Sequence, residues 1–191
     1  MNGNGGWIRR SWLCLGGILL VSGFLMAQDT LHSPLSIPLR FSGNFGEIRT
    51  GHFHTGMDIR TGGVEGVPVL AAQTGRISRV KVSDAGYGLA LYLDGRGLTT
   101  VYAHLSRFHP DIEAWLRETQ YANERWAFDG PPTETFSFNA GDTIGLSGNS
   151  GRSFGPHLHF EVRDQRRQWP INPLHWTLVG EGMTHDDVPP E

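Results

Sequence analysis

Short apolar runs separated by glycines dominate the chain from Phe41 onward. The 191-residue sequence contains 26 glycines, and the runs between them are rich in Val, Ile, Leu and Tyr. Short strands that alternate with turn signals are typical of all-β domains. We therefore predict an all-β fold: a small antiparallel β-sheet that rolls into a barrel-like sandwich.

Two segments show this alternation of strand and turn in detail. The segment "VPVLAAQTGRISRVKV" divides at Thr74 and Gly75 into two strand-like halves. The segment "LALYLDGRGLTTVYAHLS" divides at residues 94–97, where the glycines and Asp94 are the residue types that hairpin turns favour. We expect two strands from the first segment and a hairpin from the second.

One segment breaks the strand pattern. Pro110 is well suited to start a helix, and apolar or small side chains follow at helical spacing: Ile112, Trp115, Leu116 and Thr119. We predict one inserted helix at about 110–124, within an insertion at about 109–137. Residues 127–135, which contain a glycine and two prolines, are expected to form a loop.

The first 27 residues differ in composition from the rest of the chain. Arg9 and Arg10 precede an uncharged apolar run that ends at Ala27, a pattern typical of a secretory signal peptide. The alternative is a retained membrane anchor, although the run is slightly short for a bilayer crossing. We expect an exported protein of the periplasm or the extracellular space, with membrane contact only if this segment is retained.

Removal of residues 1–27 would also remove Cys14, the single cysteine, so the exported protein would contain no disulfide. Loss of two arginines would shift the net charge from −3 to about −5. The sequence contains no basic stripe, which argues against a nucleic-acid partner. We expect a monomer with an extended lead-in at 28–44, a domain at 45–179 and a flexible tail at 180–191.

The segment "GPHLHFEVRD" places two histidines one residue apart in an apolar strand. Side chains alternate between the two faces of a strand, so His157, His159 and Glu161 should share one face. The other face carries a core stripe of Leu158, Phe160 and Val162. Two surface histidines on a half-buried strand would give the same pattern.

A third histidine stands in the segment "TTVYAHLS". Strict alternation would place His104 on one face with Thr100 and Tyr102. The other face would then hold Thr99, Val101, Ala103 and Leu105.

The segment "GHFHTGMDIRTGG" contains His54 and Asp58, four residues apart. Its glycines disfavour a helix, and in an extended segment this even spacing keeps both side chains on one side. An imidazole and a carboxylate with this orientation form half of a zinc site. Catalytic zinc takes three protein ligands and leaves one position to water. One histidine of the later pair can be the third ligand, while the other is free to act as a general base.

The segments "HTGMD", "YAHLS" and "SGNSGRSFGPHLHFEVR" occur in the order found in the lysostaphin-like, or LytM-type, zinc metallopeptidases, and the resemblance runs from about Phe45 to Pro173. These enzymes have small antiparallel β folds and hydrolyse peptide bonds of bacterial peptidoglycan. The resemblance implies one Zn²⁺ per domain, peptidoglycan peptides as the substrate, and five site residues. It assigns His54, Asp58 and His159 as zinc ligands, with His157 and His104 as the catalytic histidines.

Two further features of the sequence are not part of this assignment. The segment between His104 and Gly141 is longer than in compact members of the family, and we hypothesise that its helix forms one wall of a substrate groove. Arg49 precedes the first ligand and could orient the substrate, or it could be an ordinary surface charge. Two other functions stay open: a non-catalytic cell-wall binding module that activates a partner amidase, and a zinc protease that acts on extracellular glycine-rich proteins.

Overall fold

The computed structural model describes residues 30–180 together with Met1. The signal peptide predicted at residues 1–27 and most of the tail predicted at 180–191 lie outside the described residues. Within residues 30–180, no helix combines the length and apolar character that a bilayer crossing requires.

The described residues form short strands, one α-helix and one short 3₁₀ helix. In chain order they are β1 (Thr30–His32), β2 (Phe41–Gly43), β3 (Ile48–Arg49), β4 (His52–Phe53), β5 (Met57–Arg60), β6 (Pro68–Leu70), β7 (Gly75–Val82), β8 (Leu89–Gly95), β9 (Leu98–Phe108), α1 (Pro110–Ala122), β10 (Phe128–Gly130), β11 (Ser137–Phe138), β12 (Thr143–Ser147), β13 (His157–Asp164), β14 (Pro170–Ile171), η1 (Pro173–His175) and β15 (Thr177–Val179).

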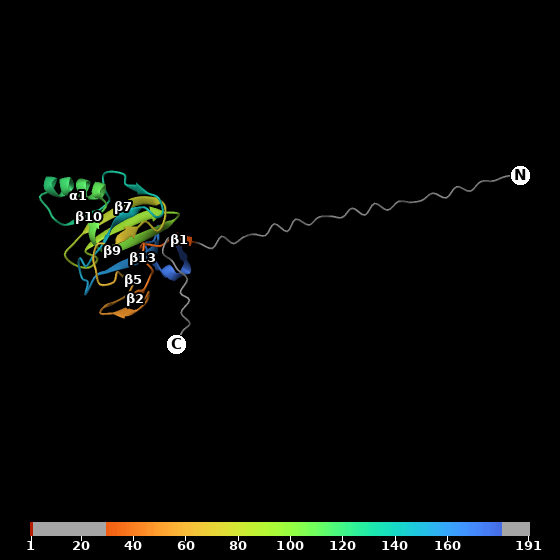
Figure 1. Ribbon diagram of the computed structural model, residues 1–191. Helices are drawn as coiled ribbons and strands as arrows, with labels where there is room; N and C mark the ends of the chain where they lie inside the picture. The colour runs from red at the N-terminus through yellow and green to blue at the C-terminus, as the bar shows by residue number, and fades with distance from the viewer. Residues whose placement is uncertain (2–29, 181–191) are drawn as a thin grey trace.

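An 11-stranded antiparallel sheet organises the molecule (Figure 1). Its main path runs β10-β7-β8-β9-β13-β5-β2, and β12 joins it by pairing with both β6 and β9. The path has two ends, so the sheet is open and does not close into a barrel. The predicted antiparallel all-β fold is confirmed, with the difference that the sheet stays open.

The hairpin between β8 and β9 follows the prediction closely. Arg96 and Gly97 form its turn with positive φ angles of 51° and 78°. Two consecutive positive φ angles define the turn type that matches the twist of paired strands, and glycine adopts such angles without strain. The division of the earlier segment into β6 and β7 is confirmed as well.

The main hydrophobic core lies on one face of the central strands. Leu158, Phe160 and Val162 of β13 are completely buried in this core, so the predicted alternation along this strand is confirmed. His159 and Glu161 therefore project from the opposite face, where they pair with Ala103 and Val101 of β9. The two faces of β13 thus separate the core from the polar site.

Strand β9 departs from strict alternation at His104, which adopts a positive φ of 59°. The pairing with β8 skips one residue of β9 between Tyr102 and Leu105, which is the signature of a β-bulge. Val101 and Ala103 lie together, as predicted. Leu105, however, lies in the main core with Tyr102 instead of with Ala103, and the His104 ring lies beside the rings of His157 and His159. The predicted grouping of His104 with Tyr102 is wrong, because the extra residue in the bulge reverses the alternation.

Helix α1 confirms the predicted inserted helix. Its buried side chains, Ile112, Trp115 and Leu116, belong to the main core cluster. That cluster lies on the face of β13 opposite to His159, so these contacts do not support the hypothesis that the helix forms a wall of the substrate groove.

The loop predicted at residues 127–135 begins with a short strand instead. Strand β10 pairs with the edge of β7, and Asp129 binds Arg79 and Lys81 across the pair. Phe128 meets the ring of Trp115 edge to face at 5.2 Å. The ion pairs between β10 and β7 and this aromatic contact stabilise a strand in a segment whose glycine and prolines indicated a loop.

The lead-in predicted at residues 28–44 packs against the domain. Strand β1 pairs with β15 in parallel, which brings the two ends of the described chain together. Leu31 and Leu35 of this segment are buried in the main core. The described part of this segment therefore contributes to the core.

Candidate metal centre

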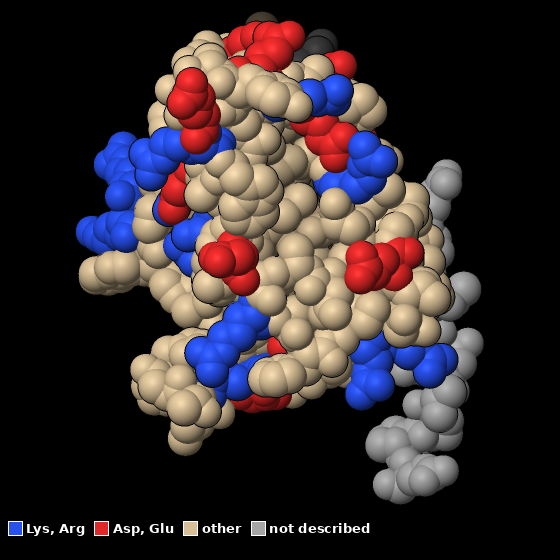
Figure 2. Space-filling model, turned by 90° about the vertical axis from the view of Figure 1, so that its left-hand side faces the viewer, with Lys and Arg blue, Asp and Glu red and all other residues tan. Residues whose placement is uncertain are grey.

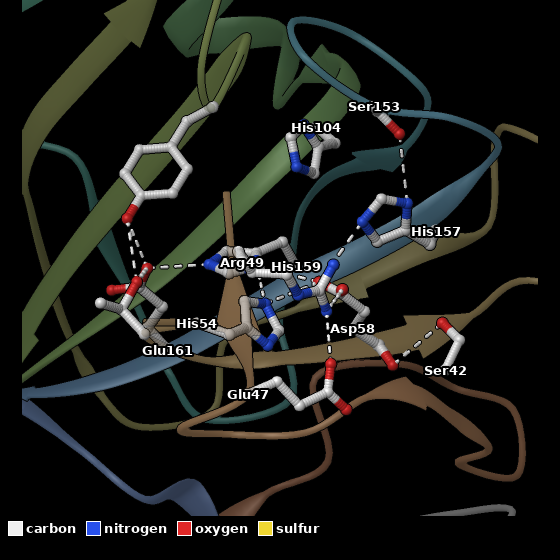
Figure 3. A network of polar contacts seen from close by, with 12 residues as sticks. Ser42, Glu47, Arg49, His54, Asp58, His104, Ser153, His157, His159 and Glu161 are labelled. Atoms are coloured by element: carbon white, nitrogen blue, oxygen red, sulfur yellow. Dashed lines mark hydrogen bonds and ion pairs between the residues drawn. The ribbon is translucent and has the colours of Figure 1, made fainter. Parts of the chain in front are cut away.

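Three predicted site residues meet between strands β5 and β13 (Figure 3). Asp58 lies on β5 directly opposite His159 on β13 in the strand register. His54 comes from the short segment between β4 and β5, and its ring lies beside both. Antiparallel pairing therefore brings together residues that are 101 positions apart in the sequence.

The three candidate ligand atoms form a nearly equilateral triangle. His54 Nε2 lies 3.1 Å from Asp58 Oδ1 and 3.0 Å from His159 Nδ1, and the third side, from His159 Nδ1 to Asp58 Oδ1, is 3.0 Å. Two ligands of a tetrahedral zinc ion with bonds of about 2.0–2.1 Å lie roughly 3.4 Å apart. All three residues are buried. The spacing is therefore close to that needed for one small cation.

The outer contacts of the two imidazoles determine which nitrogen carries the hydrogen. His54 donates Nδ1–H to the backbone carbonyl of Asn44 at 2.8 Å, and His159 donates Nε2–H to Glu161 at 2.8 Å. Their other ring nitrogens then carry lone pairs, and both point toward Asp58 Oδ1. Three electron-pair donors facing one point repel one another unless a cation lies between them, so the residues present fit a bound metal ion.

The charge of the site also favours a cation. Burial raises the pKa of Asp58, but the close ring nitrogens of His157, His159 and His54 outweigh it and hold the pKa well below its usual range. Burial lowers the pKa of His159, yet Asp58 and Glu161 outweigh it and raise the pKa overall. Asp58 therefore keeps its negative charge in the triangle, and the raised pKa of His159 shows that positive charge is favoured next to it.

Arg49 binds the second oxygen of Asp58. Its guanidinium lies 3.0 Å from Asp58 Oδ2 and 2.9 Å from Glu47. Gly43 leaves room for this contact, since a Cβ atom there would collide with both Arg49 and Asp58. Asp58 is thus left with one oxygen for a metal. Arg49 is therefore not an isolated surface charge, because its guanidinium binds a candidate ligand.

The two remaining predicted histidines lie next to the triangle. The His104 and His157 rings are 4.8 Å apart, and His157 Nε2 is 3.4 Å from Asp58 Oδ1. His157 donates Nδ1–H to the carbonyl of Gly155, and His104 donates Nδ1–H to that of Ser150, both at 2.8 Å. Each ring therefore keeps its Nε2 lone pair free.

His104 is the more deeply buried of these two histidines. Burial lowers its pKa to about 4, although the hydrogen bond to Ser150 acts in the opposite direction. His104 is accordingly neutral at pH 7. It is held there by the bulge in β9 and by the loop that contains Ser150, so its position depends on two separate segments.

Glu161 is a functional candidate that received no role from the sequence. Its carboxylate is completely buried and binds His159, Thr55, Tyr87 and Arg163. Burial raises its pKa, but hydrogen bonds and charge from His159 and Arg163 outweigh this and lower the pKa to about 2. Its place on the same strand face as His159 was visible in the sequence. Its partners were not, because they come from distant segments.

The charged side chains of the molecule are dispersed. Figure 2 shows a face on which acidic and basic residues lie singly or in small groups of mixed sign around an uncharged centre. Two aromatic side chains close to site residues in the sequence are exposed: Phe53 directly precedes His54, and Phe154 lies in the loop before His157.

Comparison with known proteins gives consistent matches. The model of peptidase family M23 matches residues 52–120 and 135–173. The DD-carboxypeptidase/endopeptidase Mpg of Neisseria meningitidis is 32% identical over 173 residues, which are 90% of this chain and 34% of that protein. The chain therefore spans about a third of the length of these curated relatives.

Two solved structures have similar folds. Csd3 of Helicobacter pylori is 27% identical with a TM-score of 0.56, and the match covers 83% of this chain and 36% of that chain. The catalytic domain of the antimicrobial peptidase lysostaphin from Staphylococcus simulans is 23% identical with a TM-score of 0.53, covering 71% of this chain and 90% of that chain. The second likeness bears on the fold alone.

Proposed function

Since this chain belongs to peptidase family M23, we propose that it is an exported zinc endopeptidase that hydrolyses peptide stems or cross-links of bacterial peptidoglycan. The observation that carries the proposal is the convergence of three lone pairs from His54, Asp58 and His159 on one point. The endopeptidase name of the Neisseria meningitidis relative supports peptide-bond hydrolysis. The choice of peptidoglycan comes from the resemblance to the lysostaphin-like peptidases.

In this proposal His54, Asp58 and His159 hold the zinc ion. Zinc in such a site polarises the substrate carbonyl and lowers the pKa of water. Arg49 keeps Asp58 oriented so that a single carboxylate oxygen faces the ion.

His157 takes the proton of the attacking water and passes it to the leaving amine. Its free Nε2 lies 3.4 Å from Asp58 Oδ1, so it is next to the ligand triangle. The carbonyl of Gly155 fixes the ring with the accepting nitrogen toward the site. A general base must lie within reach of the proton that it abstracts and must start unprotonated.

His104 orients the attacking water as a second acceptor. The alternative role, stabilisation of the oxyanion, would require a hydrogen on Nε2. The carbonyl of Ser150 already takes the Nδ1 hydrogen, and the pKa of about 4 opposes a second proton on the ring. We therefore assign water orientation to His104; a zinc ion held by His54, Asp58 and His159 would supply the positive charge that stabilises the oxyanion.

The test is release of peptide fragments from purified cell walls, followed by mass spectrometry. We expect release by the zinc-loaded protein, loss of release with a chelator, and recovery when zinc is added back. His157→Ala should abolish release, whereas His52→Ala, which changes an exposed histidine, should retain it. Unchanged release by His157→Ala would contradict the mechanism, and cleavage of a glycine-rich peptide without cell-wall cleavage would contradict the substrate.

A further inference from the structure

The buried carboxylate of Glu161 has an unusual number of hydrogen-bond donors. Glu161 is 0% exposed. Its Oε1 accepts hydrogen bonds from His159 Nε2 at 2.8 Å, Thr55 Oγ1 at 2.6 Å and Tyr87 Oη at 2.5 Å. Its Oε2 accepts one from Arg163 at 2.6 Å. A buried carboxylate is stable only when it is paired and hydrogen-bonded, and these four donors satisfy that need.

These donors come from three separate parts of the fold. Thr55 immediately follows the candidate ligand His54, Tyr87 precedes strand β8, and Arg163 lies on β13 two residues after Glu161. Arg163 also donates to the Tyr87 hydroxyl at 3.1 Å, so the hydroxyl has its own hydrogen free for Glu161. The carboxylate is therefore held from both sides.

The backbone at Gly56 packs closely against one side of Glu161. A Cβ atom on Gly56 would lie 2.7 Å from Glu161 Cγ and would also collide with the carbonyl of Phe160. The glycine of the segment "HTGMD" thus has a physical reason: the chain between His54 and Asp58 passes directly against Glu161.

Tyr87 also connects this carboxylate to the bulge in β9. Its backbone carbonyl accepts the backbone N–H of His104 at 2.9 Å. Its ring lies 5.4 Å from the His159 ring. One residue therefore contacts both a candidate metal ligand and the segment that holds a candidate catalytic histidine.

We propose that Thr55 and Tyr87 are positioning residues of the metal centre. Their hydroxyls hold Glu161 so that its carboxylate takes the Nε2 hydrogen of His159 and leaves the Nδ1 lone pair directed at the metal. This inference rests on the proposed role of His159 as a zinc ligand. Outer contacts of this kind commonly change metal affinity 10- to 100-fold when they are removed.

The experiment compares two pairs of variants that differ in one hydroxyl group. Thr55→Val removes the hydroxyl and keeps the shape, whereas Thr55→Ser keeps the hydroxyl. Tyr87→Phe removes the phenol oxygen and keeps the ring beside His159. Tyr121→Phe makes the same change at an exposed tyrosine on helix α1.

The measurements are the zinc dissociation constant, from competition with a chromophoric chelator, and the visible absorption spectrum of the cobalt-substituted protein. We expect Thr55→Val and Tyr87→Phe to weaken zinc binding about tenfold or more and to alter the cobalt spectrum. Thr55→Ser and Tyr121→Phe should bind zinc as the unchanged protein does.

The possible outcomes separate this inference from the proposed function. If the unchanged protein binds no zinc, the proposed function fails. If it binds zinc and Thr55→Val matches it in affinity and in cobalt spectrum, the positioning role is overturned. The threonine pair alone decides the question if Tyr87→Phe does not fold.

Discussion

At the scale of single residues, the position of one hydrogen on each imidazole determines what the candidate site can bind. Backbone carbonyls accept the Nδ1 hydrogens of His54, His104 and His157. A carboxylate accepts the Nε2 hydrogen of the fourth ring, that of His159. Every ring therefore presents a lone pair to the site without rotation of a side chain. Such preorganisation spares the site from reorganising its dipoles during binding or reaction.

The buried neutral state of His104 predicts a specific loss of stability in acid. An unfolded histidine has a pKa of about 6.5, and burial lowers the pKa of folded His104 to about 4. Between these values only the unfolded state binds the proton, so stability present above pH 6.5 falls as the pH drops toward 4. From pH 7 to pH 5 the free energy of unfolding should fall by about 2 kcal/mol through His104 alone.

Urea unfolding at pH 7 and pH 5 measures this effect by comparison with His104→Asn. Asparagine accepts a positive φ angle with little strain, so the bulge can persist in the variant. The unchanged protein should lose about 2 kcal/mol more than the variant over this interval. The exposed His52→Asn variant is the control and should follow the unchanged protein. An equal loss in the unchanged protein and in His104→Asn would contradict a buried neutral imidazole.

At the scale of secondary structure, regular strands were predictable and the bulge was not. The alternation along β13 separates core from site as the sequence indicated. In β9 the same rule fails at His104, because one extra residue is accommodated there with a positive φ. No glycine marks that position, so the sequence carried no local signal for it.

The candidate ligands could be predicted because local sequence patterns identify them, whereas the role of Glu161 could not. The short even spacing of His54 and Asp58, together with the resemblance of three motifs, was enough to name them. The role of Glu161 depends on Thr55 and Tyr87, whose contacts with it span 106 and 74 positions in the sequence. Contacts of that length follow from the strand register, which local patterns do not determine.

Helix α1 provides a prediction about stability at the same scale. Trp115 packs edge to face against Phe128 and Phe136 and donates its ring N–H to Thr133 at 2.8 Å. Replacing a buried tryptophan by alanine leaves a cavity and costs about 3–5 kcal/mol. We expect Trp115→Ala to lower the free energy of unfolding by that amount in a urea titration.

The matched control lies on the same helix. Tyr121 is 78% exposed, so Tyr121→Ala should change stability by less than about 0.5 kcal/mol. Zinc affinity should be unchanged in both variants while they remain folded, because the buried side of the helix contacts the core and not the site. A loss of zinc affinity in folded Trp115→Ala would show that the insertion supports the metal centre after all.

At the scale of the whole molecule, the candidate metal centre joins segments that are far apart in the chain. The predicted ligands connect the segment around His54 and Asp58 to strand β13, with 105 positions between the two histidines. Strands β1 and β15 join the ends of the described chain on a separate two-stranded sheet. A metal ion bound only in the folded state would therefore stabilise a long-range connection that no disulfide provides.

This arrangement predicts that a chelator lowers the melting temperature of the whole domain. A ligand that binds only the folded state adds about 4 kcal/mol of stability when its free concentration is 1,000 times its dissociation constant. One kcal/mol corresponds to about 2–4 °C for a domain of this size, so zinc removal should lower the melting temperature by roughly 10 °C. Calorimetry with zinc, with chelator, and after zinc is restored measures the shift and its reversal.

His159→Ala should melt at one temperature under all three conditions, whereas His109→Ala, at the start of α1, should keep the full shift. A melting temperature of the unchanged protein that is indifferent to zinc and chelator would mean that the three converging lone pairs do not hold the ion, whatever their spacing.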